Sequence, residues 1–241
     1  MAVTNTPDVL TEATAELALA LTLAAARRMS DAERGPARRR LARLGSPAAY
    51  RGIEIAGSTV GVVGLGRIGH RYARLAHGLG AKIAYAGHLP SRRRRASSAP
   101  ACSSSTSCSR ASDVVSLHAP AIPETRGLIG ARELELIGSG RRAGQHLAGS
   151  TRRYRGRRSG ARERDARRGR LDVYDGEPHV PAGIAQRAAL RPASAHRLGH
   201  GRPPATGWHG AAADNVIAVL EGADPPSRVI LAGGSRFAGL A

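Results

Sequence analysis

Aromatic side chains are scarce in this chain of 241 residues, where they make up 3% of the composition, with one Trp and one Phe. The formal net charge of +19 invites a nucleic-acid function, because clustered arginine neutralises phosphate. Proteins that bind single-stranded nucleic acid also stack its bases on aromatic side chains, and the basic segments contain only Tyr154 and Trp208 for this. Helix-turn-helix and zinc-finger spacings are missing as well. A direct role in nucleic-acid binding is therefore disfavoured.

Cysteines and long apolar runs are also few. Cys102 and Cys108 lie in a serine-rich stretch and match no metal-binding or redox spacing, so no metal site is predicted. The longest early apolar run, residues 17–26, is about half of the roughly 20 residues that span a bilayer. The N-terminus carries Asp8 and Glu12 without a basic flank, unlike a signal peptide. These features predict a cytoplasmic protein with no membrane partner.

Acidic residues are nearly missing from three segments in particular. Residues 91–110, 138–170 and 182–210 contain 5, 12 and 4 arginines and only two acids, Glu163 and Asp165. Their surplus equals the formal charge of the whole protein, so the rest of the chain is balanced. The basicity is therefore a local feature and does not describe the fold.

Strand and helix patterns alternate along the remainder. Short, continuous, β-branched runs are typical of strands that are covered on both faces. The predicted strands are 59–63, 81–85, 113–117 and 171–174, and the predicted helices are 9–28, 68–79, one within 123–137, and 211–220. This order predicts an α/β fold with a Rossmann-type doubly wound parallel sheet. We expect one domain over residues 1–225 and a tail at 226–241. The sheet should be incomplete, because four segments do not fit the pattern: 36–45, 91–110, 138–170 and 182–210.

Residues 64–69 (GLGRIG) match the pattern GxGxxG directly after a predicted strand and at the start of a predicted helix. In that context Gly64 permits the tight turn, Gly66 lets the backbone approach a pyrophosphate, and Gly69 allows close helix–strand packing. The helix N-terminus offers N–H groups and the positive end of its dipole to the phosphates. The pattern predicts an NAD(P)-binding domain, with a glycine-rich turn that binds no ligand as the alternative.

The end of the second predicted strand bears on the choice of cofactor. An acid normally stands there and binds the ribose hydroxyls of NAD. Residues 85–90 (YAGHLP) contain no acid, and four arginines follow at 92–95. Because such cations would accommodate the 2′-phosphate of NADP, the cofactor is predicted as NAD or NADP.

Five pieces of the chain together resemble the D-isomer-specific 2-hydroxyacid dehydrogenases, and they follow in that family's order: 3–20, 51–70, 113–135, 171–178 and 214–222. They cover about a third of the chain and match only the cofactor-binding part of the family, without its substrate domain. The resemblance implies an NAD(P)-dependent oxidoreductase that transfers a hydride between the cofactor and a D-2-hydroxy acid or 2-keto acid. It also implies a homodimer, since the family's helix that matches 9–28 lies near the dimer interface.

The resemblance assigns roles to individual residues. Glu177 falls on the glutamate that hydrogen-bonds the catalytic histidine and raises its pKa. His196 is the nearest candidate for that histidine, which passes a proton to or from the C2 oxygen of the substrate. The implied cofactor-binding residues are Arg67 and Ile68 at the pyrophosphate turn, His118, Pro120 and Thr125 in the cofactor cleft, and Asp172 at the nicotinamide carboxamide. Without the resemblance, Glu177 is more often a solvated loop acid and Asp172 a turn or cap residue.

Two family motifs are not where the resemblance expects them. An arginine within a motif like VNTARG should stand at position 148, where the chain has Ala148, and residues 194–200 (SAHRLGH) replace a segment like PHIGSAT. Codons can be chosen for which a one-base shift restores both motifs, a similar shift gives the family's residues at 105–109, and another at 38–44 gives two tryptophans. We hypothesise that the chain derives from a GC-rich dehydrogenase gene with compensating frameshifts, either biological or introduced in sequencing. Resequencing codons 35 to 210 tests this.

Four functions stay open at this point. The first is the oxidoreductase implied by the resemblance, whose activity in this chain the missing arginine puts in question. The second is a catalytically inactive module that binds a dinucleotide. The third is a basic nucleic-acid-binding protein, for which steep salt dependence of binding would be diagnostic. The fourth is an interaction module, which a dimer without affinity for the cofactor would favour.

Overall fold

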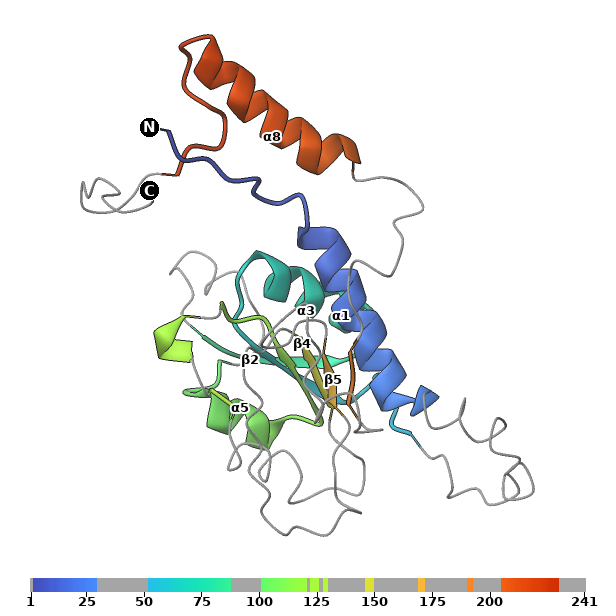
Figure 1. The fold of residues 1–241 in the computed structure, drawn as a ribbon. Helices are drawn as coiled ribbons and strands as arrows, with labels where there is room; N and C mark the ends of the chain where they lie inside the picture. The colour runs from blue at the N-terminus through green and yellow to red at the C-terminus, as the bar shows by residue number, and fades with distance from the viewer. Residues whose placement is uncertain are drawn as a thin grey trace. The chain divides into compact units, whose positions relative to one another are not determined.

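The computed structural model describes residues 2–29, 52–87, 101–120, 122–125, 128–129, 146–149, 169–171, 190–192 and 205–229. The chain divides into two compact units, one formed by Met1–Thr11 with Gly199–Ala241 and the other by Glu12–Leu198. The larger unit contains the sheet and the smaller one contains the last helix (Figure 1). Within the described ranges, no helix is long and apolar enough to cross a membrane.

The larger unit is built on a six-stranded sheet with the order β2-β1-β3-β4-β5-β6, and every recorded strand pair is parallel. The strands are β1 (Thr59–Val63), β2 (Lys82–Ala86), β3 (Val114–Leu117), β4 (His146–Gly149), β5 (Gly169–Leu171) and β6 (Leu190–Pro192). Because β2 lies on one side of β1 and β3 on the other, the strand order reverses between β1 and β3. This confirms the predicted Rossmann-type parallel sheet.

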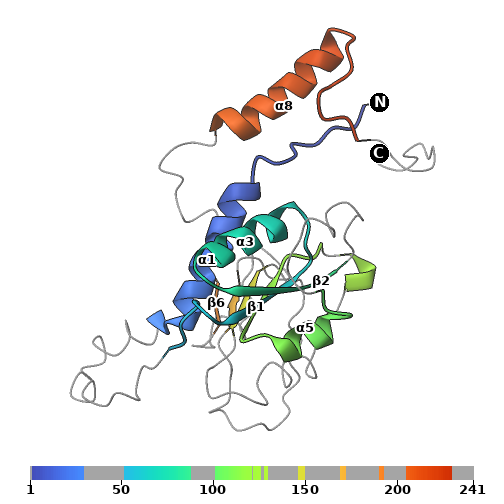
Figure 2. The ribbon, with the colours of Figure 1, turned by 180° about the vertical axis from the view of Figure 1, so that it is seen from behind.

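Helices cover both faces of this sheet (Figures 1 and 2). Helices α1 (Thr11–Ala26) and α3 (Arg67–Gly78) share one apolar cluster with Val60 and Val62 of β1, whereas Val63 belongs to a second cluster with Cys108 of α5 (Ser105–Ala111). The alternation follows from the period of two in a strand, which sends successive side chains to opposite faces. Strand β1 is therefore covered on both sides, as its continuous apolar sequence predicts.

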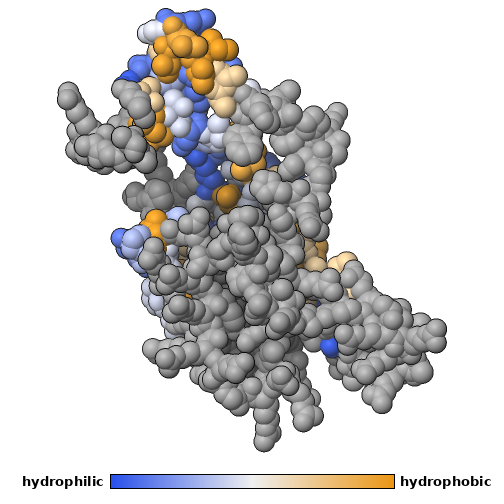
Figure 3. All heavy atoms as spheres, viewed as in Figure 1, coloured by the Kyte–Doolittle hydropathy of each residue, from blue (hydrophilic) through white to orange (hydrophobic). Residues whose placement is uncertain are grey.

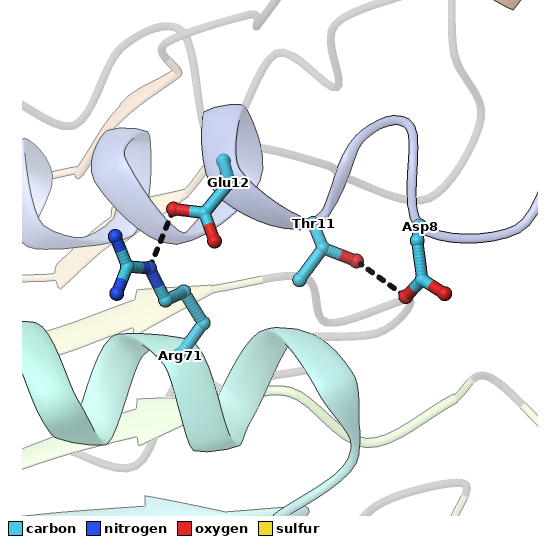
Figure 4. Close-up of polar contacts among 4 residues, drawn as sticks. All are labelled: Asp8, Thr11, Glu12 and Arg71. Atoms are coloured by element: carbon cyan, nitrogen blue, oxygen red, sulfur yellow. Dashed lines mark hydrogen bonds and ion pairs between the residues drawn. The ribbon is translucent and has the colours of Figure 1, made fainter. Parts of the chain in front are cut away.

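Helix α1 begins at Thr11, two residues later than its sequence pattern predicts, and it buries residues on several sides. The Thr11 hydroxyl donates to Asp8 Oδ1 at 3.5 Å. Helix α1 is joined to α3 by an ion pair of 2.5 Å between Glu12 Oε2 and Arg71 Nε (Figure 4). Both of these charged side chains are partly exposed, so the pair contributes roughly 0–1 kcal/mol and the buried apolar face holds the two helices together.

Three elements lie inside segments that the sequence pattern does not explain: α5, β4 and β6. Helix α5 begins with a capping box in which Ser104 and Ser107 satisfy each other's backbone amides. Before α5, Ala101 forms a single parallel bridge with Tyr85 at the outer edge of β2. The predicted strand at 171–174 is represented by Leu171 at the end of β5, and residues 172–174 lie outside the described residues.

The smaller unit contains α8 (Ala205–Leu220), which begins six residues before the helix predicted at 211–220. Asn215 is 2% exposed, and its amide donates to Asn5 O at 3.1 Å and Ala211 O at 2.8 Å while it accepts from Ser227 N at 2.9 Å. Thr4 and Arg228 form an antiparallel bridge beside it. Exposed apolar side chains gather on α8 (Figure 3): Val216, Ile217, Val219 and Leu220.

Candidate functional site

The candidate site lies at the carboxyl ends of β1 and β3, where the strand order reverses. Strand β1 ends at Val63 and runs into Gly64, and β3 ends at Leu117 and runs into His118. The His118 amide donates to Val63 O at 2.7 Å, which keeps the two strand ends side by side. In open α/β sheets a ligand binds in the crevice outside such a point.

Close contacts with backbone atoms require that positions 64 and 69 have no side chain. Gly64 has a φ of 91°, and a Cβ built on it would lie 2.7 Å from both Ala119 N and the carbonyl carbon of His118. A Cβ on Gly69 would lie 2.0 Å from Gly64 O. Helix α3 therefore starts in direct contact with the turn that follows β1. These are the roles that the motif predicts for the first and third glycines.

Gly66 is different, because its surroundings are open. A Cβ on Gly66 would have no neighbour within 4 Å, and the residue has an extended conformation with a φ of −70°. It is the N-cap of α3 but provides no side-chain cap, and the His70 amide is bonded to its carbonyl at 2.9 Å. The amides in the first turn of a helix, which here come before that of His70, have no hydrogen-bond partner within the helix. An open backbone position beside such amides fits a pyrophosphate, whose charge the helix dipole also favours.

The first turn of α3 contains the two other predicted residues of this motif. Arg67 is exposed and Ile68 is half-buried against the cluster formed by α1 and α3. An exposed cation in the first turn of a helix suits a site for an anionic group. The assignment of Arg67 and Ile68 to a pyrophosphate turn stays a prediction.

His118 follows the carboxyl end of β3, next to the start of α3, and its side chain makes two contacts. Its Nε2 is 2.8 Å from Ser116 Oγ, and its ring packs at a tilt of 41° on Tyr72, with 4.9 Å between the ring centroids. Its Cβ is 3.3 Å from the place where a Cβ on Gly69 would lie. Burial lowers the pKa of His118 to about 4, so the imidazole is neutral at pH 7.

Pro120 and Thr125 are brought together in the loop that follows His118. The Thr125 hydroxyl donates to Pro120 O, and it accepts from the Ile122 amide at 3.1 Å. A short 3-10 turn, Pro123–Thr125, carries this threonine. Thr125 thus fixes the path of the loop beside the crevice.

The remaining predicted residues are not brought to the site by the described part of the chain. Asp172, Glu177 and His196 lie outside the described residues. Ala148, at the position where an arginine is expected, lies on β4 opposite Ser116 of β3. The carboxyl end of β4 is therefore next to that of β3.

Sequence reasoning missed three residues that support His118: Thr22, Tyr72 and Ser116. All three are fully buried, and Thr22 Oγ1 lies 2.9 Å from the Tyr72 hydroxyl. Burial raises the pKa of Tyr72, and its hydrogen bonds with Thr22 and Ser116 act in the opposite direction. The available signal was that each of them is a polar residue at an otherwise apolar position, as in VVSL of β3.

Comparison with known proteins places these features in context. A sequence model of the NAD-binding domain of D-isomer specific 2-hydroxyacid dehydrogenases matches residues 19–142. The chain is 35% identical over 240 residues to a glyoxylate reductase of Aeropyrum pernix, a match that covers 94% of this chain and 69% of that protein. It is 38% identical over 138 residues to a glyoxylate reductase of Thermococcus litoralis, covering 56% of this chain and 42% of that protein.

Solved structures show the same likeness over nearly the whole chain. A protein of Thermus thermophilus has a TM-score of 0.74 at 31% identity, covering 95% of this chain and 72% of that one. An NADPH-dependent glyoxylate/hydroxypyruvate reductase of Sinorhizobium meliloti, solved with NADP and malonate, has a TM-score of 0.73 at 25% identity, covering 95% and 70%. Each of these solved chains is longer than the part that this chain matches.

Proposed function

This chain belongs to the D-isomer-specific 2-hydroxyacid dehydrogenases, and from that premise we propose that it binds NAD or NADP at Gly64–Gly69 and transfers a hydride between the cofactor and a 2-hydroxy acid or 2-keto acid. The family and its class of oxidoreductase chemistry agree with the resemblance found in the sequence. The substrate class follows that of the relatives, several of which are glyoxylate reductases.

One observation carries the proposal: the open Gly66 at the start of α3, between two glycines that are closely packed. Gly66 is exposed, and a side chain there would meet no other atom of the described chain, so packing within the protein does not require glycine at this position. Since Gly66 has a negative φ, its conformation alone does not require glycine. A ligand that approaches the backbone explains why no side chain is present there.

The reacting groups are assigned through the family resemblance. When bound, the nicotinamide accepts or supplies the hydride at the C2 carbon of the substrate. We assign His196 to pass a proton to or from the C2 oxygen, and Glu177 to hold that histidine by a hydrogen bond. Asp172 would meet the carboxamide, and Arg67, Ile68, His118, Pro120 and Thr125 would line the rest of the cofactor site.

Ala148 favours a second candidate, a module that binds the cofactor without turnover. The substrate carboxylate of this family is held by an arginine, and an alanine at the end of β4 offers no positive charge. Substitution Ala148→Arg tests this directly. A gain of reductase activity in that variant would assign the loss of turnover to this position, and unchanged activity would contradict the assignment.

Binding is tested by titrating the protein with NADH and NADPH and following cofactor fluorescence. We expect Gly66→Val to weaken binding at least tenfold, because its side chain would fill the space at the helix N-terminus. Gly78→Val is the matched control, since a Cβ at Gly78 of the same helix also has no neighbour within 4 Å but lies at the far end of α3. Equal affinity of the two variants would refute the site.

The titration also separates NAD from NADP. Residues 82–87 (KIAYAG) give the end of β2 no carboxylate that would repel a 2′-phosphate, so we expect NADPH to bind at least as well as NADH. Reduction of glyoxylate, measured as the loss of nicotinamide absorbance, then tests turnover.

A homodimer and a cytoplasmic location are further parts of the proposal, and sedimentation and cell fractionation would test them.

A further inference from the structure

A row of polar side chains crosses the layer between α1, α3 and the sheet. Thr22 on α1, Tyr72 on α3 and Ser116 on β3 each have an exposed fraction of 0%, and the row ends at His118 in the crevice. Burying polar groups in an apolar core costs free energy unless each one is hydrogen-bonded. Each polar group in this row therefore needs a hydrogen-bond partner, and these hydrogen bonds determine how the side chains are arranged.

The direction of each hydrogen bond follows from counting protons, because a hydroxyl has only one to donate. Thr22 Oγ1 donates to Ala18 O at 2.9 Å, so it accepts from the Tyr72 hydroxyl at 2.9 Å. Tyr72 has then used its proton, and its interaction with Ser116 lowers its pKa, which is the effect of a donor to the phenol oxygen, so Ser116 is taken as that donor. Ser116 Oγ in turn accepts from His118 Nε2 at 2.8 Å. The proton of a neutral His118 is thereby placed on Nε2.

The other ring nitrogen of His118 is left as an acceptor. No hydrogen bond to Nδ1 is recorded among the described residues, and the buried side-chain atom without a partner in that part of the chain is Ser109 Oγ. Nδ1 is therefore accessible from outside the core rather than enclosed in it. Packing of the ring on Tyr72 fixes the plane in which its lone pair lies.

We propose that Tyr72 is a positioning residue, which together with Thr22 and Ser116 holds His118 in the Nε2–H tautomer and presents Nδ1 to the crevice as a hydrogen-bond acceptor. Its ligand would be a donor group of the dinucleotide, either a hydroxyl or an amide. A phosphate oxygen has no proton to donate at pH 7, so His118 would set the position of the cofactor without competing for the pyrophosphate. This role rests on the proposed function.

The tautomer can be measured without cofactor, by ¹⁵N NMR of the protein labelled at histidine, with His118→Gln identifying the signal. We expect the His118 spectrum of a single Nε2–H tautomer in the unaltered protein and a mixture of tautomers in Tyr72→Phe. Thr22→Val should give a partial mixture, and Thr22→Ser should restore the single form. Tyr85→Phe is the matched control, because Tyr85 is also a buried tyrosine but makes none of these contacts. A Nδ1–H tautomer in the unaltered protein, or an unchanged tautomer in Tyr72→Phe, would overturn the proposal.

Cofactor titration of the same variants tests the acceptor role. We expect Tyr72→Phe to weaken dinucleotide binding about three- to tenfold, as the loss of one well-placed hydrogen bond implies, and Thr22→Ser to leave it unchanged. Unchanged affinity in Tyr72→Phe despite a mixed tautomer would refute the acceptor role. Lack of binding by the unaltered protein would refute the proposed function instead, and the tautomer measured without cofactor would still decide whether Tyr72 positions His118.

Discussion

Substitution of Gly64 by alanine should destabilise the protein more than the same change at another glycine of positive φ. Gly64 has a φ of 91° and Gly57 a φ of 76°, so an alanine at either position pays a similar conformational cost of roughly 1–2 kcal/mol. A Cβ at Gly57 has nothing within 4 Å, whereas one at Gly64 would lie 2.7 Å from backbone atoms of His118 and Ala119. Overpacking of this kind costs a further 1–3 kcal/mol or so.

The free energy of unfolding, measured in urea for the two alanine variants, gives the difference between these costs. We expect Gly57→Ala to lose roughly 1–2 kcal/mol and Gly64→Ala roughly 2–5 kcal/mol. Because the conformational cost is shared, the difference between the variants reports the contact between the β1 turn and the residues after β3. Equal losses in the two variants would show that these strand ends are not packed as described.

Three further predictions concern separate parts of the molecule. Since burial lowers the pKa of His118 from 6.5 to about 4, the unfolded chain binds more protons between these values, and stability should fall as the pH drops from 6.5 to 4; His118→Gln should flatten the urea-derived profile over that range. Asn215→Ala should remove the hydrogen bonds to the amide of half-buried Ser227 and the carbonyl of exposed Asn5, each worth roughly 0.5–1.5 kcal/mol, and hydrogen exchange should rise at 3–5 and 227–229 while the sheet is unaffected. Ser109→Ala should raise the free energy of unfolding by about 1 kcal/mol, because the buried Ser109 hydroxyl has no partner among the described residues; a loss of stability would contradict this.

The sequence predicts the first half of the sheet closely. Strand β1 occupies the predicted residues 59–63, and β2 differs from its prediction by one residue. Continuous β-branched runs next to a glycine turn have few other stable conformations between two layers of helices, so local pattern is enough there. The same holds for the turn at Gly64–Gly69, where a short motif specifies both the backbone and its neighbours.

The parts that sequence reasoning missed depend on partners far along the chain. Strands β4 and β6 are recognisable by their parallel pairing with neighbours rather than by composition, and β6 ends in a proline. Thr22 and Tyr72 meet across 50 residues of sequence, and periodicity carries no information about such a pair. Of the predicted site, the glycine turn, His118, Pro120 and Thr125 lie among the described residues. The assignments of Asp172, Glu177 and His196 stay predictions.

Gly61 in the middle of β1 shows how α5 can lie where it does with so polar a sequence. A Cβ there would be 2.3 Å from Ser112 Oγ and 2.9 Å from Cys108 Sγ, so the helix rests almost on the strand backbone. At that separation only small side chains fit, and serine or cysteine serves as well as alanine. A change of gene frame that exchanges one set of small residues for another could therefore leave this layer in place. The packing against β1 therefore limits the size of the side chains on α5 more than their chemistry.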